Sequence, residues 1–447
     1  MEHTKKAGFS SRLGFILAAA GSAVGLGNIW RFPYLAAKYG GGIFLLVYVI
    51  FAVTFGFTLM ITEIAIGRKT GKSCIEAFGI LHKKYDFIGY IAALVPIIIF
   101  PYYCVIGGWV TKFVTVYTTG SGKAAADDSY FPAFISQTGQ PIIFLAIFIV
   151  LTALIIMMGV QNGIEKVSKV LMPVLAIMTV GIAIYSLTLP GALDGLVYYV
   201  KPNFEMFSLK TVVAAMGQLF YSMSLAMGIM ITYGSYMNKK DDLEKSVRNI
   251  EIFDTGIAFM AGVMIIPAVF AFSNGDTSKL QQGPTLMFVT LPKVFDSMKG
   301  GQIVGAVFFI LVFFAALTSS VSLMETILSV FMDKLHVKRI AGSIVILGIA
   351  FLMAIPSSMG FGAWSNIQLL GRDFLDFFDF ISNNILMPIV GLFTCLFVGY
   401  VVKPKTIEEE IESSGKFKSA KLYRVMVKYI APVFLLVIFI SSVVGYV

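Results

Sequence analysis

The sequence predicts an all-α polytopic membrane protein with eleven transmembrane helices. Of its 447 residues, 57% are hydrophobic and 13% are charged, which is unlike a soluble protein of several domains. Apolar runs long enough to cross a bilayer recur along the whole chain. Glycine and polar residues interrupt the first and the sixth run, and interrupted helices at matching places in two halves predict an inverted five-plus-five repeat.

The predicted spans follow one another with short polar connections, so residues 1–447 are expected to form a single domain. Helices 1–5 cover roughly 13–189, helices 6–10 roughly 211–402 and helix 11 roughly 425–446. The separate runs are 13–37, 42–66, 87–118, 141–159, 167–189, 211–237, 247–272, 301–332, 340–356, 374–402 and 425–446. Residues 284–291 predict a short re-entrant or capping hairpin, and residues 403–421 a partly helical cytoplasmic loop.

The distribution of charge predicts the orientation, because the basic residues of short loops are retained on the cytoplasmic side. The net charge is +9, and most of the 34 Lys and Arg residues fall in segments that lie inside when the N-terminus is inside. We therefore predict a multi-pass protein of the cell membrane with a cytoplasmic N-terminus and with Val447 outside. Because the basic charge is spread over several loops rather than one face, nucleic-acid binding is not expected.

A signal peptide is the alternative interpretation of residues 1–26, since Lys5 and Lys6 precede an apolar run that ends in small residues. The apolar segment continues through Trp30 and Phe32 without a clear cleavage site, which favours a transmembrane helix. Cys74, Cys104 and Cys395 are far apart in the sequence, so neither a disulfide framework nor a metal site is expected.

The first interruption lies in residues 18–33, which carry three glycines, an asparagine, an arginine and a proline inside an apolar run. Glycine lowers helix propensity and Pro33 restricts the residue before it, so the helix is expected to break near Gly25–Gly27. Broken backbone at membrane depth is tolerated only where it faces protein or lines a cavity. The segment therefore predicts a binding site that uses backbone dipoles.

The second interruption lies in residues 218–228, where a glutamine, two serines and a glycine stand among large apolar residues of the sixth span. Small residues in membrane helices often serve only close helix packing, and this alternative applies to each segment taken alone. Two interruptions at corresponding positions favour a site near the midplane.

Several motifs in order along the chain now resemble one family. They are Ser11–Ala18 (SRLGFILA), Gly25–Pro33 (GLGNIWRFP), Glu63 with Gly67–Arg68, Gly217–Ser222 (GQLFYS), Ile231–Tyr236 (ITYGSY) and Phe313–Ser320 (FFAALTSS). From Phe9 to the eleventh span, the chain resembles the neurotransmitter:sodium symporters, particularly the bacterial amino-acid members with the leucine-transporter fold. The resemblance implies sodium-coupled import of an amino acid by alternating access, with residues 1–447 as one transporter domain.

The resemblance implies two sodium sites built from oxygen ligands, which a hard cation prefers. The first is formed by the Ala23 carbonyl, Asn28, Ser222, the residue at position 254 and the carboxylate of the substrate itself. Substrate and ion would then bind cooperatively. The second is formed by Gly21, Val24, Ala315, Thr318 and Ser319, although a Thr-Ser-Ser cluster alone more often bonds its own helix.

Position 254 departs from the family, which commonly has asparagine where this chain has Asp254. An ionisable residue inside a span is costly unless it serves a function. We expect Asp254 to supply the anion that chloride supplies in eukaryotic relatives, so that no chloride is required, and to be protonated when the site is empty. The alternative is an aspartate that reaches the inner helix end, since Arg248 is near in the sequence.

The substrate site implied by the resemblance holds a carboxylate at the free amides of Leu26 and Gly27 and at Tyr103. Gly25 replaces the aspartate that pairs with the amine in relatives for biogenic amines, so an amino acid is favoured over a monoamine. Met227 replaces a phenylalanine and is flexible enough to repack around different guests. We expect bulky hydrophobic or aromatic L-amino acids, such as tyrosine, tryptophan, phenylalanine or leucine. The side-chain pocket would be lined by Ile99, Tyr103, Tyr221, Ser222, Ser224, Met227, Ser319 and Leu323.

Gating groups also follow from the resemblance. Arg31 and Asp379 resemble a charged pair that closes above the site, and Tyr103 and Tyr221 the lid beneath it. On the inside, Lys6 stands where many members have arginine, with Ser235, Tyr236 and Asp333 as partners. Lysine lacks the bidentate fork of arginine, so a looser inner gate is expected. A Gly-x9-Pro spacing at Gly163 and Pro173 is associated in the family with unwinding of the fifth span.

An enzyme is not expected, because His3, His82 and His336 all fall in predicted cytoplasmic loops and leave no Ser-His pair at depth. A channel remains the rival interpretation, since re-entrant backbone also builds ion filters. A scaffold or receptor would leave both interrupted helices unexplained. The residues do not indicate an oligomeric state.

Overall fold

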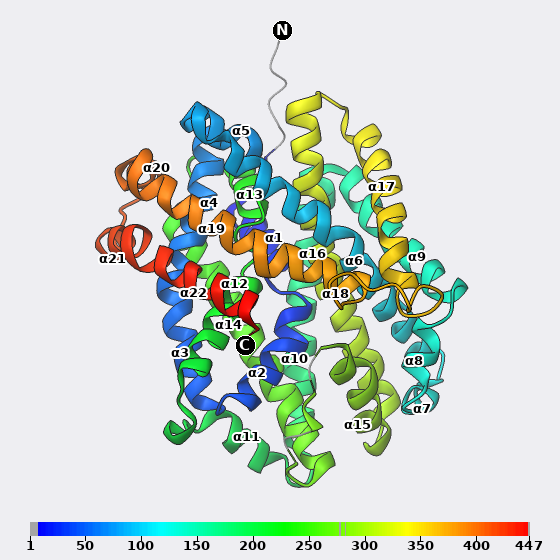
Figure 1. Cartoon of the computed structure of the whole chain (residues 1–447). Helices are drawn as coiled ribbons and strands as arrows, with labels where there is room; N and C mark the ends of the chain where they lie inside the picture. The colour runs from blue at the N-terminus through cyan, green and yellow to red at the C-terminus, as the bar shows by residue number, and fades with distance from the viewer. Residues whose placement is uncertain (1–7, 277–278, 282, 446–447) are drawn as a thin grey trace.

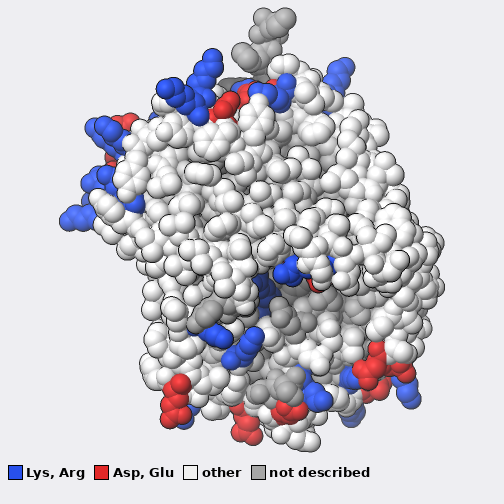
Figure 2. Space-filling model, viewed as in Figure 1, with Lys and Arg blue, Asp and Glu red and all other residues white. Residues whose placement is uncertain are grey.

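The computed structural model describes residues 8–276, 279–281 and 283–445, and this part of the chain is helical (Figure 1). The first described residues lie at the same end of the molecule as α5 and α13, since the Phe9 amide donates to the Tyr236 carbonyl at 3.0 Å, and α2, α11 and α15 lie at the opposite end (Figure 1). Figure 2 shows charged side chains gathered at these two ends, with a broad band of uncharged residues between them. Such a band is the surface that a bilayer requires of a membrane-spanning protein.

The first half of the chain builds five spans. The first consists of α1 (Arg12–Ala23), η1 (Gly27–Arg31) and α2 (Phe32–Lys38), and the second of α3 (Gly42–Phe51), η2 (Ala52–Gly56) and α4 (Phe57–Thr70). The third is α6 (Asp86–Thr118), the fourth α9 (Gly139–Met157), and the fifth η4 (Val160–Glu165) with α10 (Lys166–Leu187). The short helices are α5 (Cys74–Leu81), η3 (Lys83–Tyr85), α7 (Gly122–Ala125), α8 (Tyr130–Ile135), α11 (Ala192–Val200) and η5 (Phe204–Met206).

The second half builds the remaining spans. The sixth consists of α12 (Leu209–Ser222) and α13 (Ile229–Tyr236), followed by α14 (Leu243–Ser273), α16 (Gly301–Leu335) and α17 (Arg339–Met359). The tenth consists of α18 (Phe374–Asp379), η8 (Phe380–Leu386), α19 (Met387–Leu396) and η9 (Phe397–Val401). The eleventh consists of α21 (Ala420–Val425), η10 (Met426–Ile430) and α22 (Ala431–Val444). Connecting helices are η7 (Leu286–Thr290), α15 (Leu291–Ser297) and α20 (Pro404–Glu412).

The predicted fold class is confirmed. Within the described residues, nine helices are long and apolar enough to cross a membrane, and α1 with the helix Gly27–Lys38, bent by 56° to each other, makes a tenth. The predicted sixth span is occupied by α12 and α13, which flank the break Met223–Gly228. The apolar stretch 284–291 is largely helical, within η7 and the start of α15, and the predicted loop 403–421 contains α20.

Side-chain caps show why helices begin where they do. The Ser11 hydroxyl accepts a hydrogen bond from the Gly14 amide at the start of α1, and Asp242 accepts one from the Lys245 amide at the start of α14. Ser208 and Thr211 form a reciprocal capping box at the start of α12. Each cap satisfies an amide that has no partner within its own helix, which stabilises the helix by about 1 kcal/mol.

Two glycines allow α4 and α13 to pack with their backbones in contact. A Cβ atom at Gly67 would collide with the carbonyl oxygen of Ile231, and one at Gly234 would collide with the carbonyl oxygen of Ile64. Backbone atoms cannot move aside as the end of a side chain can. The second span and the inner half of the sixth therefore pack closer than any residue with a side chain would permit.

The end of the second span at Thr70 is bonded to α20. Arg68 is buried, and its Nε lies 2.8 Å from Glu410 Oε1. The same guanidinium donates to the Asp241 carbonyl at 2.9 Å and to the Ser414 hydroxyl at 2.9 Å. A buried charge is stable only when it is paired and fully hydrogen-bonded, and these three partners meet that requirement.

We predict that Gly234→Ala destabilises the protein, because the added methyl group must push α13 away from α4. Overpacking of this kind costs about 1–3 kcal/mol. The melting temperature of the protein in detergent should fall by several degrees. Gly348→Ala in α17 is the matched control, since no atom lies within 4 Å of its added Cβ. Equal melting temperatures for the two variants would contradict the close packing.

Candidate functional site

The first span is broken between Ala23 and Gly27. Val24 is extended, with φ −72° and ψ 98°, so the helical hydrogen bonds of α1 end there. The Asn28 side chain turns back and accepts a hydrogen bond from the Gly25 amide at 3.1 Å. From α12, Gln218 Nε2 donates to the Gly27 carbonyl at 3.1 Å. The break predicted near Gly25–Gly27 thus lies at Val24–Leu26, and polar side chains satisfy part of its freed backbone.

The second break contains two non-glycine residues in the left-handed region, Ser224 with φ 52° and Ala226 with φ 61°. Such a conformation costs about 1–2 kcal/mol per residue. Neighbouring helices hold it in place, because Ser224 Oγ donates to the Ser22 carbonyl at 2.9 Å and the Ala226 amide donates to Glu63 Oε1 at 2.7 Å. The two breaks therefore lie side by side and are bonded to each other.

Asp254 of α14 reaches the point where the two breaks meet. Its Oδ1 accepts a hydrogen bond from Asn28 Nδ2 at 2.8 Å, and the Ser222 hydroxyl lies 3.1 and 3.2 Å from its two carboxylate oxygens. The Asp254 side chain is fully buried, and no Lys, Arg or His of the described chain forms an ion pair with it. A buried carboxylate that contacts only neutral donors suits a bound cation.

A second group of oxygens lies where α1 ends against α16. Ser319 Oγ is 3.4 Å from the Gly21 carbonyl and 3.4 Å from the Val24 carbonyl. One residue earlier, Thr318 Oγ1 donates to the Ala315 carbonyl at 3.1 Å. Ser319 therefore points across to α1 and does not merely bond its own helix, whereas Thr318 does bond its own helix. The five residues predicted for the second sodium site lie together.

The predicted carboxylate pocket lies around Gly25. A Cβ atom there would be 2.9 Å from Ser319 Oγ and 3.4 Å from Tyr103 Oη, so there is no room for an aspartate side chain. The Tyr103 hydroxyl is buried and has no hydrogen-bond partner among the described residues. An unpartnered buried hydroxyl is costly, and a ligand oxygen would satisfy it. The apolar residues of the predicted pocket, which are Leu26, Ile99, Met227 and Leu323, are all buried.

The predicted outer pair is not joined in this structure. The Arg31 guanidinium stacks on the Tyr221 ring, 4.3 Å from its centroid, and Tyr221 Oη donates to Asn384 Oδ1 at 2.9 Å. Asp379 Oδ1 instead accepts from Tyr102 Oη at 3.1 Å and from Asn383 Nδ2 at 2.6 Å. No ion pair within 4.0 Å links Arg31 to Asp379 in the described chain.

The predicted inner gate has partners that the motifs did not indicate, and Lys6 lies outside the described residues. Asp333 Oδ2 accepts from the Ser73 amide at 2.7 Å, and Asp333 Oδ1 lies 3.9 Å from Lys72 Nζ. A hydrogen bond to Glu76 and the nearby Asp333 charge raise the pKa of Lys72 and keep it cationic. Ser235 donates to the Thr232 carbonyl at 2.6 Å, and Tyr236 donates to Glu325 Oε1 at 2.7 Å.

Glu325 and Arg339 form a buried ion pair that sequence reasoning missed. The two terminal nitrogens of Arg339, Nη1 and Nη2, each lie 2.7 Å from an oxygen of the Glu325 carboxylate, and Glu325 is fully buried. The pair joins α16 to α17, and Glu325 also accepts the hydrogen bond from Tyr236. A carboxylate inside an apolar run is rare and marks a site by default, so Glu325 carried a signal in the sequence, but its partner could not be identified from it.

Glu165 is a second missed residue, and it joins the start of α1 to the fifth span. Its carboxylate accepts from the Ser10 amide at 2.7 Å, from the Ser10 hydroxyl at 2.6 Å and from the Ser11 hydroxyl at 2.9 Å. Lys169 Nζ lies 2.6 Å from Glu165 Oε1. Beside it, the fifth span is helical without interruption from Val160 to Leu187, so the segment from Gly163 to Pro173 is wound in this structure.

The chain is similar to known membrane transporters over almost its whole length. The family model described as the sodium:neurotransmitter symporter family matches residues 6–122 and 129–447. An uncharacterized sodium-dependent transporter of Haemophilus influenzae is 34% identical over 97% of this chain and 97% of its own length. The sodium- and chloride-dependent GABA transporter 2 of Homo sapiens is 23% identical over 98% of this chain and 80% of its own length.

A solved structure is also similar to this one. It is the crystal structure of MhsT in complex with L-phenylalanine, with a TM-score of 0.87 and 38% sequence identity. The match covers 98% of this chain and 100% of that chain. The overall arrangement of the helices is therefore the one seen in that protein.

We predict that Glu165→Gln loosens the start of α1, because the neutral amide loses the ion pair with Lys169 and weakens the bonds to Ser10 and Ser11. Hydrogen bonds to a charged group are worth about 1.5–3 kcal/mol, so amide hydrogen exchange in residues 8–12 should become about tenfold faster or more. Glu409→Gln on the exposed face of α20 is the control and should leave this segment unchanged. Unaltered exchange in Glu165→Gln would show that Glu165 does not hold the segment.

Proposed function

The chain belongs to the sodium:neurotransmitter symporter family, a family of sodium-dependent transporters, and on this premise we propose that it imports a bulky hydrophobic or aromatic L-amino acid together with sodium. The substrate would bind between the two broken spans and cross the membrane by alternating access. A transporter with these relatives is not an enzyme.

One observation carries the sodium part of the proposal, namely the fully buried Asp254 carboxylate, whose hydrogen bonds within the described chain come from the neutral side chains of Asn28 and Ser222. Burial of a charge without a counter-charge is strongly unfavourable, and a sodium ion would supply the counter-charge. The Ala23 carbonyl, at the end of α1, and the substrate carboxylate would complete the oxygen shell. Sodium and amino acid would each supply part of the other's site, so each raises the affinity for the other.

A second sodium ion would bind between α1 and α16. The proposed ligands are the carbonyls of Gly21, Val24 and Ala315 and the hydroxyls of Thr318 and Ser319. Ser319 is already within 3.4 Å of two of these carbonyls, so the oxygens are close together without the ion. A cation there would draw the end of α1 to α16, and its loss would free α1 to move.

We infer that chloride is not required. When ionised, Asp254 supplies an anion within the site, and it occupies the place where a neutral residue would need an added anion. The alternative position for Asp254, at the inner end of its helix, is not supported by its contacts with Asn28 and Ser222.

The pocket at Gly25 supports an α-amino acid over a monoamine. Tyr103 offers an unpartnered hydroxyl donor to a carboxylate, and no room exists at Gly25 for an acidic side chain that would pair with an amine. Met227, Ile99 and Leu323 offer a buried apolar surface to the side chain of the substrate. The bound L-phenylalanine of MhsT, which is 38% identical to this chain, fits the same class of substrate.

Access would alternate between the end that bears Arg31 and Asp379 and the end that bears the N-terminus. We propose that the N-terminus is cytoplasmic and Val447 outside, in a cell membrane. Closure of the outer end would bring Arg31 and Asp379 together above Tyr103 and Tyr221. Opening of the inner end would release Tyr236 from Glu325 and Asp333 from Ser73, and we propose Ser235 and Lys6 as further gating groups there.

We predict saturable uptake into proteoliposomes that carry an inward sodium gradient. Replacement of sodium by choline should lower the initial rate by about tenfold or more, because the buried carboxylate loses its counter-charge. Among the twenty amino acids, tyrosine, tryptophan, phenylalanine and leucine should compete best with a labelled substrate. Preference for glycine or for charged amino acids would contradict the pocket, and flux that does not saturate with substrate would favour the rival interpretation as a channel.

We also predict that uptake is unchanged when chloride is replaced by gluconate. Asp254→Asn keeps the size of the side chain but removes the anion, so its apparent sodium affinity should fall by about tenfold or more. Asp194→Asn, the same substitution at an exposed position of α11, is the control and should keep its sodium affinity. A steep loss of uptake by the unmodified protein in gluconate would overturn chloride independence without affecting the assignment of the substrate.

A further inference from the structure

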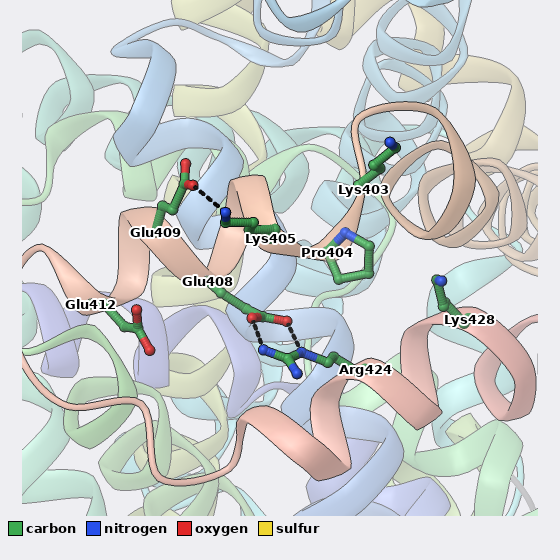
Figure 3. Close-up of a pocket in the computed structure, with 8 residues that line it drawn as sticks. All are labelled: Lys403, Pro404, Lys405, Glu408, Glu409, Glu412, Arg424 and Lys428. Atoms are coloured by element: carbon green, nitrogen blue, oxygen red, sulfur yellow. Dashed lines mark hydrogen bonds and ion pairs between the residues drawn. The ribbon is translucent and has the colours of Figure 1, made fainter.

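A recess of about 460 Å³ opens where the tenth and the eleventh span reach their ends beside α20. It lies far along the chain from the two breaks, on the side of the molecule where Lys and Arg side chains gather over α20 and α21 (Figure 1, Figure 2). The residues that line it are Lys403, Pro404, Lys405, Glu408, Glu409, Glu412, Arg424 and Lys428 (Figure 3).

The acidic residues of the recess are partly neutralised within it. Glu408 is held by Arg424 in a bidentate pair, with Arg424 Nε at 2.6 Å and Nη2 at 2.5 Å from its two oxygens. Lys405 Nζ lies 4.0 Å from Glu409 Oε1. These pairs neutralise Glu408 and Glu409, and Glu412, the third carboxylate of the lining, has no ion pair among the described residues and lies at the opposite end from Lys403 and Lys428 (Figure 3).

Lys403 and Lys428 form no ion pair with any described carboxylate. Figure 3 shows both at the same end of the recess, away from Glu409 and Glu412. Neither lysine is neutralised by a carboxylate, so this end of the recess carries a positive charge that attracts an anion. This end of the recess therefore favours a ligand with a negatively charged group such as a phosphate.

The backbone holds Lys403 in this position. Its φ is 69°, a left-handed conformation that residues with side chains rarely adopt, and Pro404 follows as the first residue of α20. Lys428 is fixed from the other side, because its carbonyl accepts a hydrogen bond from Tyr400 Oη at 2.8 Å. Strained backbone persists where the surrounding structure determines it, and such positions cluster at binding sites.

An exposed apolar surface continues from the recess along the two spans. α19 packs against α22, and η9 lies beside η10. Along this pair of spans, exposed apolar or aromatic side chains face outward, namely Leu396, Tyr400, Val425, Tyr429 and Val433. A soluble anion would use only the lysines, whereas a phospholipid would use both the lysines and this surface.

We propose that the recess binds the headgroup of an anionic phospholipid of the cytoplasmic leaflet. Its phosphate would lie between Lys403 and Lys428, and its acyl chains would lie along Tyr400, Tyr429 and Val433. The same α20 carries Glu410, which holds the buried Arg68 at the end of α4. Lipid at this position would therefore stabilise the element that closes the cytoplasmic end of the second span.

The test is native mass spectrometry of the full chain, released from detergent with phosphatidylglycerol or with phosphatidylcholine of the same acyl chains. The unmodified protein should retain phosphatidylglycerol about tenfold more strongly. The double variant Lys403→Gln/Lys428→Gln should lose this preference and keep its binding of phosphatidylcholine. The variant Lys403→Arg/Lys428→Arg keeps both charges and should retain the preference.

The matched control is Lys416→Gln/Lys421→Gln, which removes two exposed charges from the same loop outside the recess. It should retain phosphatidylglycerol as the unmodified protein does. Equal retention of the two lipids by the unmodified protein, or equal loss in the control and in the double variant, would overturn the proposal. Displacement of the lipid by millimolar inorganic phosphate would also overturn it, because a soluble anion would then be the ligand.

Discussion

The constraint on which this structure depends is that backbone groups buried at membrane depth must find partners inside the protein. Both broken spans release amides and carbonyls that a continuous helix would satisfy. Side chains from four elements bond to these groups instead, namely Asn28 after the first break, Gln218 of α12, Glu63 of α4 and Ser319 of α16. These four contacts fix the two breaks against each other and against the helices around them.

The same constraint explains the chemistry of the site. Once the helix bonds are broken, the carbonyls of Gly21 and Val24 lie near the Ser319 hydroxyl, and the Asn28 side chain bonds to Asp254. Oxygen atoms gather in two places because the chain needs acceptors and hydroxyls there to hold its own backbone. Sodium prefers such oxygens, so the groups that keep a broken helix stable are also the ones that we propose as ligands for the cation. The residues that stabilise the two breaks are therefore the same residues that we propose for the site.

Much of this arrangement could be predicted from the sequence, since it depends on local patterns. The apolar run 13–37 corresponds to Arg12–Lys38, and the glycines in it marked the break to within a residue or two. Asn28, Ser222 and Asp254 were named from motifs, and the structure places them in contact. The partners of Glu165, Glu325 and Arg68 could not be predicted, because each lies in another element and leaves no periodic signal. The positive φ angles of Ser224 and Ala226 could not be predicted either, since neither residue type favours this conformation.

The two ends of the molecule are held with different strength, and this difference has a consequence for transport. At the end where α1 begins, two ion pairs join different elements, Arg68 with Glu410 and Glu325 with Arg339, and the Glu165 carboxylate accepts hydrogen bonds from Ser10. At the other end, Arg31 stacks on Tyr221 and Asp379 bonds to uncharged partners. A ligand shifts the equilibrium between a state open at one end and a state open at the other only by the difference in its affinity for the two states. In the proposed transport cycle, opening of the end where α1 begins would therefore break several charge-assisted bonds, and departure of the proposed ion from between α1 and α16 would have to remove a comparable amount of stabilisation.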